Sequence, residues 1–133
     1  MIDPNDLESL VGAGAVEVEG SHFAEAENLL RLALAHDPDH VEANYELGFL
    51  LFKTQRYEQA IEEFRHVLWL RPDHTQAEYY LYLALSRSHH DAQAASALAN
   101  WKRLEALDRR VRTEEVAYER AREARWKEMT LAP

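Results

Sequence analysis

Apolar residues recur along the chain at the spacing of one helical face, in short segments that polar residues interrupt. Residues 41–53 form one such segment, residues 54–56 form a polar break, and residues 57–70 form the next segment. The apolar positions are Leu47, Leu50 and Leu51 in the first segment and Ala60, Ile61, Phe64, Val67 and Leu68 in the second. Pro72 ends the second segment because its ring cannot continue a helical hydrogen-bond ladder, and Pro38 does the same upstream. The pattern predicts pairs of short helices.

These helix pairs repeat with a period of 34 residues. Ala26, Ala60 and Ala94 are each 34 residues apart, and the segment Asp37-Pro38-Asp39-His40 recurs as Arg71-Pro72-Asp73-His74. Counted from the residue after each Pro-Asp-His, the units are residues 7–40, 41–74 and 75–108. Because one helix pair cannot bury both of its apolar faces, we expect the three units to stack around a continuous core.

The middle unit carries a recognisable set of residues at fixed positions. They are Asn44, Leu47, Gly48, Leu51, Ala60, Phe64 and Pro72. This set resembles the tetratricopeptide repeat, whose pattern is W-x2-L-G-x2-Y, A-x3-F and P over 34 residues. The first unit contributes Gly14, Ala26 and Pro38, whereas the third unit has Tyr82 in place of the glycine and lacks the closing proline. The resemblance implies an all-α fold, an α-solenoid of three helix-turn-helix units wound as a right-handed superhelix.

The end of the chain departs from the repeat. Trp101 stands where the earlier units have Ala33 and Val67, which indicates that the regular stack stops there. Residues 109–129 are rich in Ala, Glu and Arg, and their thin apolar stripe predicts a separate C-terminal capping helix that is partly exposed. We expect residues 1–133 to form a single domain, and this helix to cap it, extend away from it or occupy its groove.

Composition and charge exclude several classes of protein. The chain of 133 residues is 47% hydrophobic and lacks cysteine, so disulfide scaffolds and thiolate metal sites are excluded. Its net charge of −9 argues against nucleic-acid binding, and the cluster Arg109, Arg110 and Arg112 is interpreted as a solvated helix end. No run approaches the roughly 20 apolar residues of a membrane span. The N-terminus lacks the features of a signal peptide, so a cytoplasmic location is expected.

Catalytic and metal-binding patterns were sought and not found in the sequence. It contains no HExxH, no Gly-rich phosphate loop and no GxSxG. His40 and His74 occupy the same repeat position after Pro-Asp, which indicates a shared role in the turn rather than metal binding. The sequence therefore predicts no enzyme, no cofactor and no metal site.

The family resemblance implies that the first helix of each pair lines a concave surface that binds an extended or helical peptide. The candidate groove residues at these positions are Val11, Ala15, Glu42, Tyr45, Glu46, Phe49, Phe52, Tyr79, Tyr80 and Leu83. Aromatic residues lie beyond the Leu47–Leu51 face, so the helix over 41–53 is apolar nearly all round, which is typical of a binding surface. The family's carboxylate clamp of Lys, Asn, Asn, Lys and Arg is not matched, because those positions hold Val11, Ala15, Glu46, Gln76 and Tyr80.

These features predict a protein-interaction module whose partner is a peptide or helix with apolar anchors and some basic residues. Two alternatives remain open. One is a small secretion-type chaperone that shields apolar segments of its cargo. The other is a self-assembling scaffold, a homo-oligomer formed through the C-terminal end, where Trp101, Trp126 and the Arg-rich segment lie.

Overall fold

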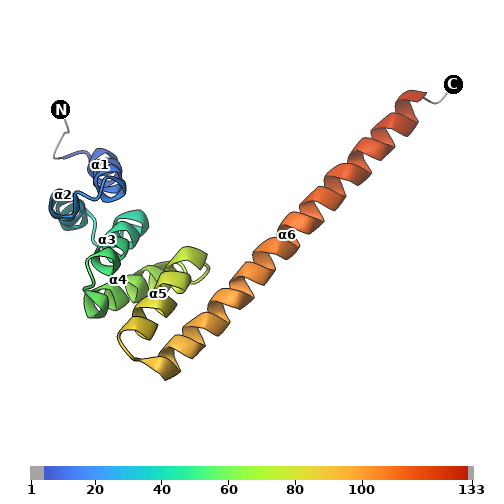
Figure 1. Cartoon of the computed structure of the whole chain (residues 1–133). Helices are drawn as coiled ribbons and strands as arrows, with labels where there is room; N and C mark the ends of the chain where they lie inside the picture. Colours follow the sequence, from blue (N-terminus) through green and yellow to red (C-terminus); the bar gives the residue numbers. More distant parts are fainter. Residues whose placement is uncertain (1–4, 132–133) are drawn as a thin grey trace. The chain divides into compact units, whose positions relative to one another are not determined.

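A computed structural model describes residues 5–131, and within them every element of regular structure is a helix (Figure 1). The helices are α1 (Leu7–Glu19), α2 (Phe23–His36), α3 (Val41–Lys53), α4 (Tyr57–Leu70), α5 (Thr75–Arg87) and α6 (Asp91–Leu131). They form two compact units, of which the first ends at Trp101 and the second begins at Lys102. The all-α fold and the helix pairs expected from the 34-residue period are confirmed.

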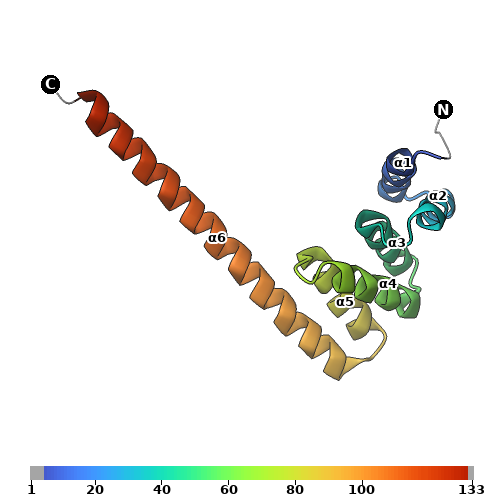
Figure 2. The same cartoon turned by 180° about the vertical axis from the view of Figure 1, so that it is seen from behind.

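In the first unit, consecutive helices pack side by side as helix–turn–helix pairs (Figures 1 and 2). The turn inside each pair has one residue in the left-handed region: Ser21, Gln55 and His89, with φ between 62° and 64°. The residues that follow, 34 apart, close each helix end in the same way; for example, the Arg56 amide donates to the Leu51 carbonyl at 2.8 Å. This is the Schellman pattern of helix termination. It explains why each pair breaks where the polar residues predicted.

Close packing inside each pair depends on glycines. A Cβ added at Gly48 would lie 2.8 Å from the ring of Phe64, and one added at Gly14 would lie 2.8 Å from Leu30. Phe64 and Leu30 are completely buried, as are Ala26 and Ala60 at the next contacts. The interpretation of these small residues as points of helix contact is confirmed.

The first helix of each pair begins with a side-chain cap at one repeat position, held by Asp6, His40 and His74. Nδ1 of His40 accepts a hydrogen bond from the Ala43 amide at 3.1 Å, and Nδ1 of His74 accepts one from the Ala77 amide at the same distance. An N-cap of this kind satisfies a backbone donor that the helix leaves unpaired. The turn role predicted for the two histidines is confirmed.

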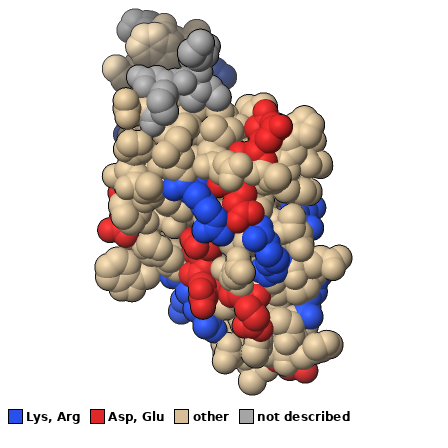
Figure 3. Space-filling view, turned by 90° about the vertical axis from the view of Figure 1, so that its left-hand side faces the viewer, with Lys and Arg blue, Asp and Glu red and all other residues tan. Residues whose placement is uncertain are grey.

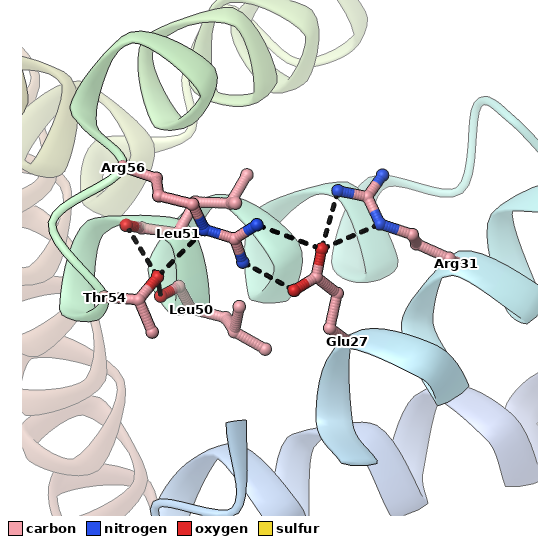
Figure 4. Close-up of polar contacts among 6 residues, drawn as sticks. All are labelled: Glu27, Arg31, Leu50, Leu51, Thr54 and Arg56. Atoms are coloured by element: carbon pink, nitrogen blue, oxygen red, sulfur yellow. Dashed lines mark hydrogen bonds and ion pairs between the residues drawn. The ribbon is translucent and has the colours of Figure 1, made fainter. Parts of the chain in front are cut away.

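Two polar groups fasten successive units to one another. The buried amide of Asn44 donates to the carbonyls of Pro38 and His40 at 2.9 Å, and so fixes the turn between α2 and α3. The carboxylate of Glu27 on α2 accepts from Arg56 at 2.5 Å and from Arg31 at 2.9 Å (Figure 4). The hydrogen bond from Arg56 is the main reason that the pKa of Glu27 is lowered. On the face shown in Figure 3, acidic and basic side chains are interleaved in the same manner.

The C-terminal helix differs from the expectation. The sequence predicts a separate helix over residues 109–129, but α6 runs from Asp91 to Leu131 without a break. The reason is local: no glycine or proline occurs between these residues, so nothing interrupts the hydrogen-bond ladder where the third repeat unit ends. Every side chain from 106 to 131 is exposed.

Substitution of Gly48 tests the close helix crossing. Gly48→Ala is expected to lower the free energy of unfolding by about 1–3 kcal/mol, because the new methyl group overlaps a ring that cannot move within the core. The matched control is Gly12→Ala on α1, where an added Cβ has nothing within 4 Å. This control is expected to gain about 0.5–1 kcal/mol from helix propensity alone. Urea denaturation measures both, and equal stability of the two variants would contradict the tight crossing.

Candidate peptide-binding groove

Aromatic side chains from α3 and α5 form a continuous cluster in the first unit. We define this ring cluster as Tyr45, Phe49, Phe52, Tyr79, Tyr80 and Trp101. Tyr80 lies at its centre, with its ring centroid 5.0 Å from Phe49, 5.4 Å from Phe52 and 5.3 Å from Tyr79. These edge-on and tilted arrangements are the ones that aromatic pairs prefer. The cluster is therefore ordered by its own contacts rather than by a ligand.

Two hollows lie on either side of Tyr79 and Tyr80, which line both of them. The first hollow, of about 300 Å³, is lined also by Phe52, Lys53, Gln55, Tyr57, Leu83 and Arg87. The second hollow, of about 240 Å³, is lined also by Tyr45, Thr75, Gln76 and Trp101. We use "groove" for the ring cluster together with these two hollows. Apolar walls with a few polar groups at the edge are the usual composition of a binding site.

The structure brings together most of the predicted groove residues, but not all of them. Tyr45, Phe49, Tyr79, Tyr80 and Leu83 are half-buried and lie in the groove. Phe52 is buried, although its ring forms part of the wall of the first hollow. On α1, Val11 is buried in a separate core cluster and Ala15 is half-buried, and neither lines the two hollows.

Two cations lie over rings of the groove. The Nζ of Lys53 lies 5.3 Å from the centroid of Phe49, and the guanidinium carbon of Arg87 lies 4.7 Å from the centroid of Phe52. A cation over a ring face at this distance is attracted by the ring quadrupole. The sequence analysis left both out of the candidate set. The signal was present, since the two residues are 34 apart and hold the last position of α3 and α5.

Trp101 is the second residue that the candidate set lacked. Its ring centroid lies 5.1 Å from that of Tyr79, and the two rings form one wall of the second hollow. The unusual size of Trp101 at a position held elsewhere by Ala33 and Val67 marked the end of the stack. It did not reveal which ring Trp101 would contact, because that depends on how α5 and α6 pack.

The carboxylates lie at the other end of α3 from Lys53. Glu42 is exposed in the first turn, and Glu46 is half-buried one turn further on. Burial raises the pKa of Glu46 above its ordinary value, and the nearby charges of Glu42 and Glu19 raise it further. Burial also raises the pKa of Tyr45, so its hydroxyl stays protonated. The groove is therefore polar along its length, with acidic groups near the start of α3 and cations near the ends of α3 and α5.

His74 connects the groove to the helix cap. Its ring centroid lies 4.9 Å from that of Tyr45, while its Nδ1 accepts from the Ala77 amide. An accepting Nδ1 requires the neutral ring with the proton on Nε2. Burial lowers the pKa of His74 below its ordinary value, and the charge of Arg71 lowers it further. The environment therefore favours the neutral form that the cap requires.

One group of side chains has metal-ligand spacing within residues 5–131. The ligand atoms of Glu17, His22 and Glu25 all lie within 4.8 Å of one another. Glu17 is half-buried and the other two residues are exposed, and Nδ1 of His22 already lies 2.6 Å from the Glu17 carboxylate. Exposed acidic groups of this kind are common without an ion, so the group does not define a metal site. Over the same residues, no helix is both long enough and apolar enough to cross a membrane.

The fold and the groove define an α-solenoid built of helix pairs, the architecture of many protein-interaction modules. A family model described as tetratricopeptide repeat matches residues 18–79, which confirms the resemblance that the repeat residues indicate. Proteins of this family are generally non-enzymatic interaction modules, and this chain is assigned to that class. A comparison with curated protein sequences finds no match.

Solved structures share the fold at low sequence identity. A crystal structure of MamA is 18% identical with a TM-score of 0.76, and the alignment covers 81% of this chain and 63% of that one. A chain of the CopN-Scc3 complex is 22% identical with a TM-score of 0.69, covering 75% and 59%. The MamA RS-1 ArsTM double mutant is 23% identical with a TM-score of 0.74, covering 79% and 59%. This chain therefore spans about 60% of the length of these three structures, and the likeness shows the fold.

The His74 cap predicts a pH dependence of stability. At pH above 6.5 the histidine is neutral in the folded and unfolded chain, and the cap is fully formed. As pH falls below 6.5 the unfolded chain takes up the proton first, so stability decreases until the pH has passed the lowered native pKa. In His74→Asn the amide oxygen caps the helix without titrating, so up to about 1 kcal/mol of this pH-dependent loss should disappear. Urea titrations of both proteins from pH 8 to pH 5 measure the difference, and parallel curves would contradict the neutral cap.

Proposed function

We propose that this chain is a non-enzymatic module that binds a peptide or helix of another protein in its groove. The observation that carries the proposal is the ring cluster of half-exposed aromatic side chains beside two open hollows. Rings that are already ordered lose little freedom on binding, so their desolvation contributes directly to affinity. The cytoplasmic location expected from the sequence is part of the same proposal.

The hollows indicate the size of what binds. With volumes of about 300 and 240 Å³, they suit single apolar side chains of a partner segment. Because Tyr79 and Tyr80 separate the hollows, two anchors on the same face of a partner helix or strand would each occupy one of them. This supports a linear segment with spaced apolar anchors as the ligand.

The charges support one direction of binding. A basic side chain of the partner fits beside Glu42 and Glu46, where its charge also relieves the cost of burying the Glu46 carboxylate. An acidic side chain or a C-terminal carboxylate fits at the other end, beside Lys53 and Arg87. Opposite charges at the two ends favour one orientation of the segment over its reverse.

Trp101 and Trp69 form a matched pair of test positions. Peptides selected from a phage-displayed random library on the wild-type protein supply the ligand, and calorimetry supplies the affinities. Trp101→Ala is expected to weaken the selected peptides about tenfold or more, because a large ring is lost from the second hollow. Trp69→Ala removes a ring that is 77% exposed on α4 and lines neither hollow, so its affinity should stay unchanged.

The selection also separates the alternatives. Peptides with spaced apolar anchors and a basic residue support a specific module. Recovery of many unrelated apolar peptides with similar affinity would favour the chaperone interpretation. Equal weakening by the two tryptophan variants, or none by either, would place binding outside the groove. Circular dichroism of each variant shows that the helices are retained.

Glu46 gives the groove a pH-dependent preference for basic ligands. Its carboxyl must lose a proton to attract a cation, and its raised pKa moves that step to higher pH. The affinity of a basic peptide should therefore rise with pH through this pKa and level off above it. Glu46→Gln should remove the rise and weaken binding about fivefold at neutral pH. Glu62→Gln on α4, an exposed carboxyl that lines neither hollow, is the control, and an equal loss in both variants would exclude a specific contact.

A further inference from the structure

The second unit exposes a row of apolar side chains along α6. We define this apolar stripe as Leu107, Val111, Tyr118 and Met129, which are spaced by four, seven and eleven residues and so share one helical side. All four are exposed, and Trp126 lies at the edge of the stripe. A helix gains most of its stability from packing an apolar side, so this stripe calls for a partner surface.

Charged residues interrupt the stripe in an ordered way. Glu114 and Glu115 follow Val111, whereas Arg122 and Arg125 follow Tyr118. Tyr118 is therefore the centre, with acidic residues about one turn before it and basic residues one to two turns after it. Arg110 already pairs with Glu114 at 3.2 Å, and Arg122 pairs with Glu119 at 3.1 Å, so these side chains extend along the exposed surface. Exposed pairs of this kind contribute little and are readily exchanged.

This order of charges suits a second copy of the same helix in only one direction. In a parallel pair in register, Glu114 faces Glu114 of the second copy and Arg122 faces Arg122 of the second copy. In an antiparallel pair centred on Tyr118, the two glutamates face the two arginines of the second copy. Leu107 and Val111 then face the segment from Trp126 to Met129 of the second copy. Charge complementarity and apolar contact are satisfied together.

We propose that the chain forms a homodimer in which residues 107–131 of α6 pair antiparallel with the same residues of a second copy, about a twofold axis near Tyr118. Such an interface is isologous, because each copy presents the same surface to the other. It involves the second unit alone and does not depend on the groove, so the two proposals succeed or fail separately.

Val111 and Val116 provide a matched pair of variants. Both are exposed to the same degree, 51% and 49%, but they lie five residues apart and so about 140° apart around the helix. Sedimentation equilibrium of the full chain measures the dimer dissociation constant. Val111→Glu is expected to raise that constant at least about tenfold, because it places a charge in the apolar contact. Val116→Glu should leave it unchanged. A wild-type monomer at every concentration up to the solubility limit, or equal effects of both variants, would overturn the proposal.

Charge exchange tests the direction of pairing. Replacing Glu114 and Glu115 by Arg, or Arg122 and Arg125 by Glu, should each abolish the dimer, because like charges then meet. The variant with all four changes should recover it, since the opposite charges again face one another. Failure of the fourfold variant to dimerise, with helix content retained by circular dichroism, would overturn the antiparallel arrangement.

Cross-linking gives an independent measurement of direction, because the chain contains no cysteine. A short bismaleimide should link Leu107→Cys to Met129→Cys when the two variants are mixed, and should link neither variant to itself. Efficient linkage of Leu107→Cys to itself would indicate a parallel pair and overturn the proposal.

Discussion

The first unit depends on how closely the two helices of each pair approach, and that distance is set by side chains that are missing. Gly48 leaves the space that the ring of Phe64 fills, and Gly14 does the same for Leu30. With the pair held this closely, the apolar residues of α3 that remain outside the contact are pushed to the opposite side, where they meet α5. The groove is thus a consequence of the packing: α3 has more apolar surface than its own pair can bury.

Each repeat position carries one physical role until the groove residues diverge. The caps Asp6, His40 and His74, and the left-handed residues Ser21, Gln55 and His89, are chemically different but act alike, because the backbone geometry is the same in each pair. Positions that face outward have no such constraint. Val11, Tyr45 and Tyr79 share one repeat position, yet the first is core and the other two line the groove. The difference between core and site therefore arises from the neighbours and not from the position.

The second unit follows a different logic. It has no repeat and no buried side chain among residues 106–131, so its surface is described by the order of residues along one helix. There the sequence is sufficient to place the apolar stripe and the charges on a common side. The groove and the stripe also use different physics: the groove offers preformed hollows, whereas the stripe offers an exposed strip that only another surface can cover.

The sequence by itself determined the helix pairs, their 34-residue period, the turn role of His40 and His74, and the family. These follow from local rules on helix faces, caps and breakers, which act within a few residues of the chain. Even the unbroken course of α6 is a local property, because no glycine or proline occurs within it, although the repeat period concealed it. Only the tertiary structure decided that Val11 is buried, that Lys53 and Arg87 lie over rings, and that Trp101 meets Tyr79. Periodicity shows which side of a helix a residue occupies, but its exposure depends on helices that are distant in sequence.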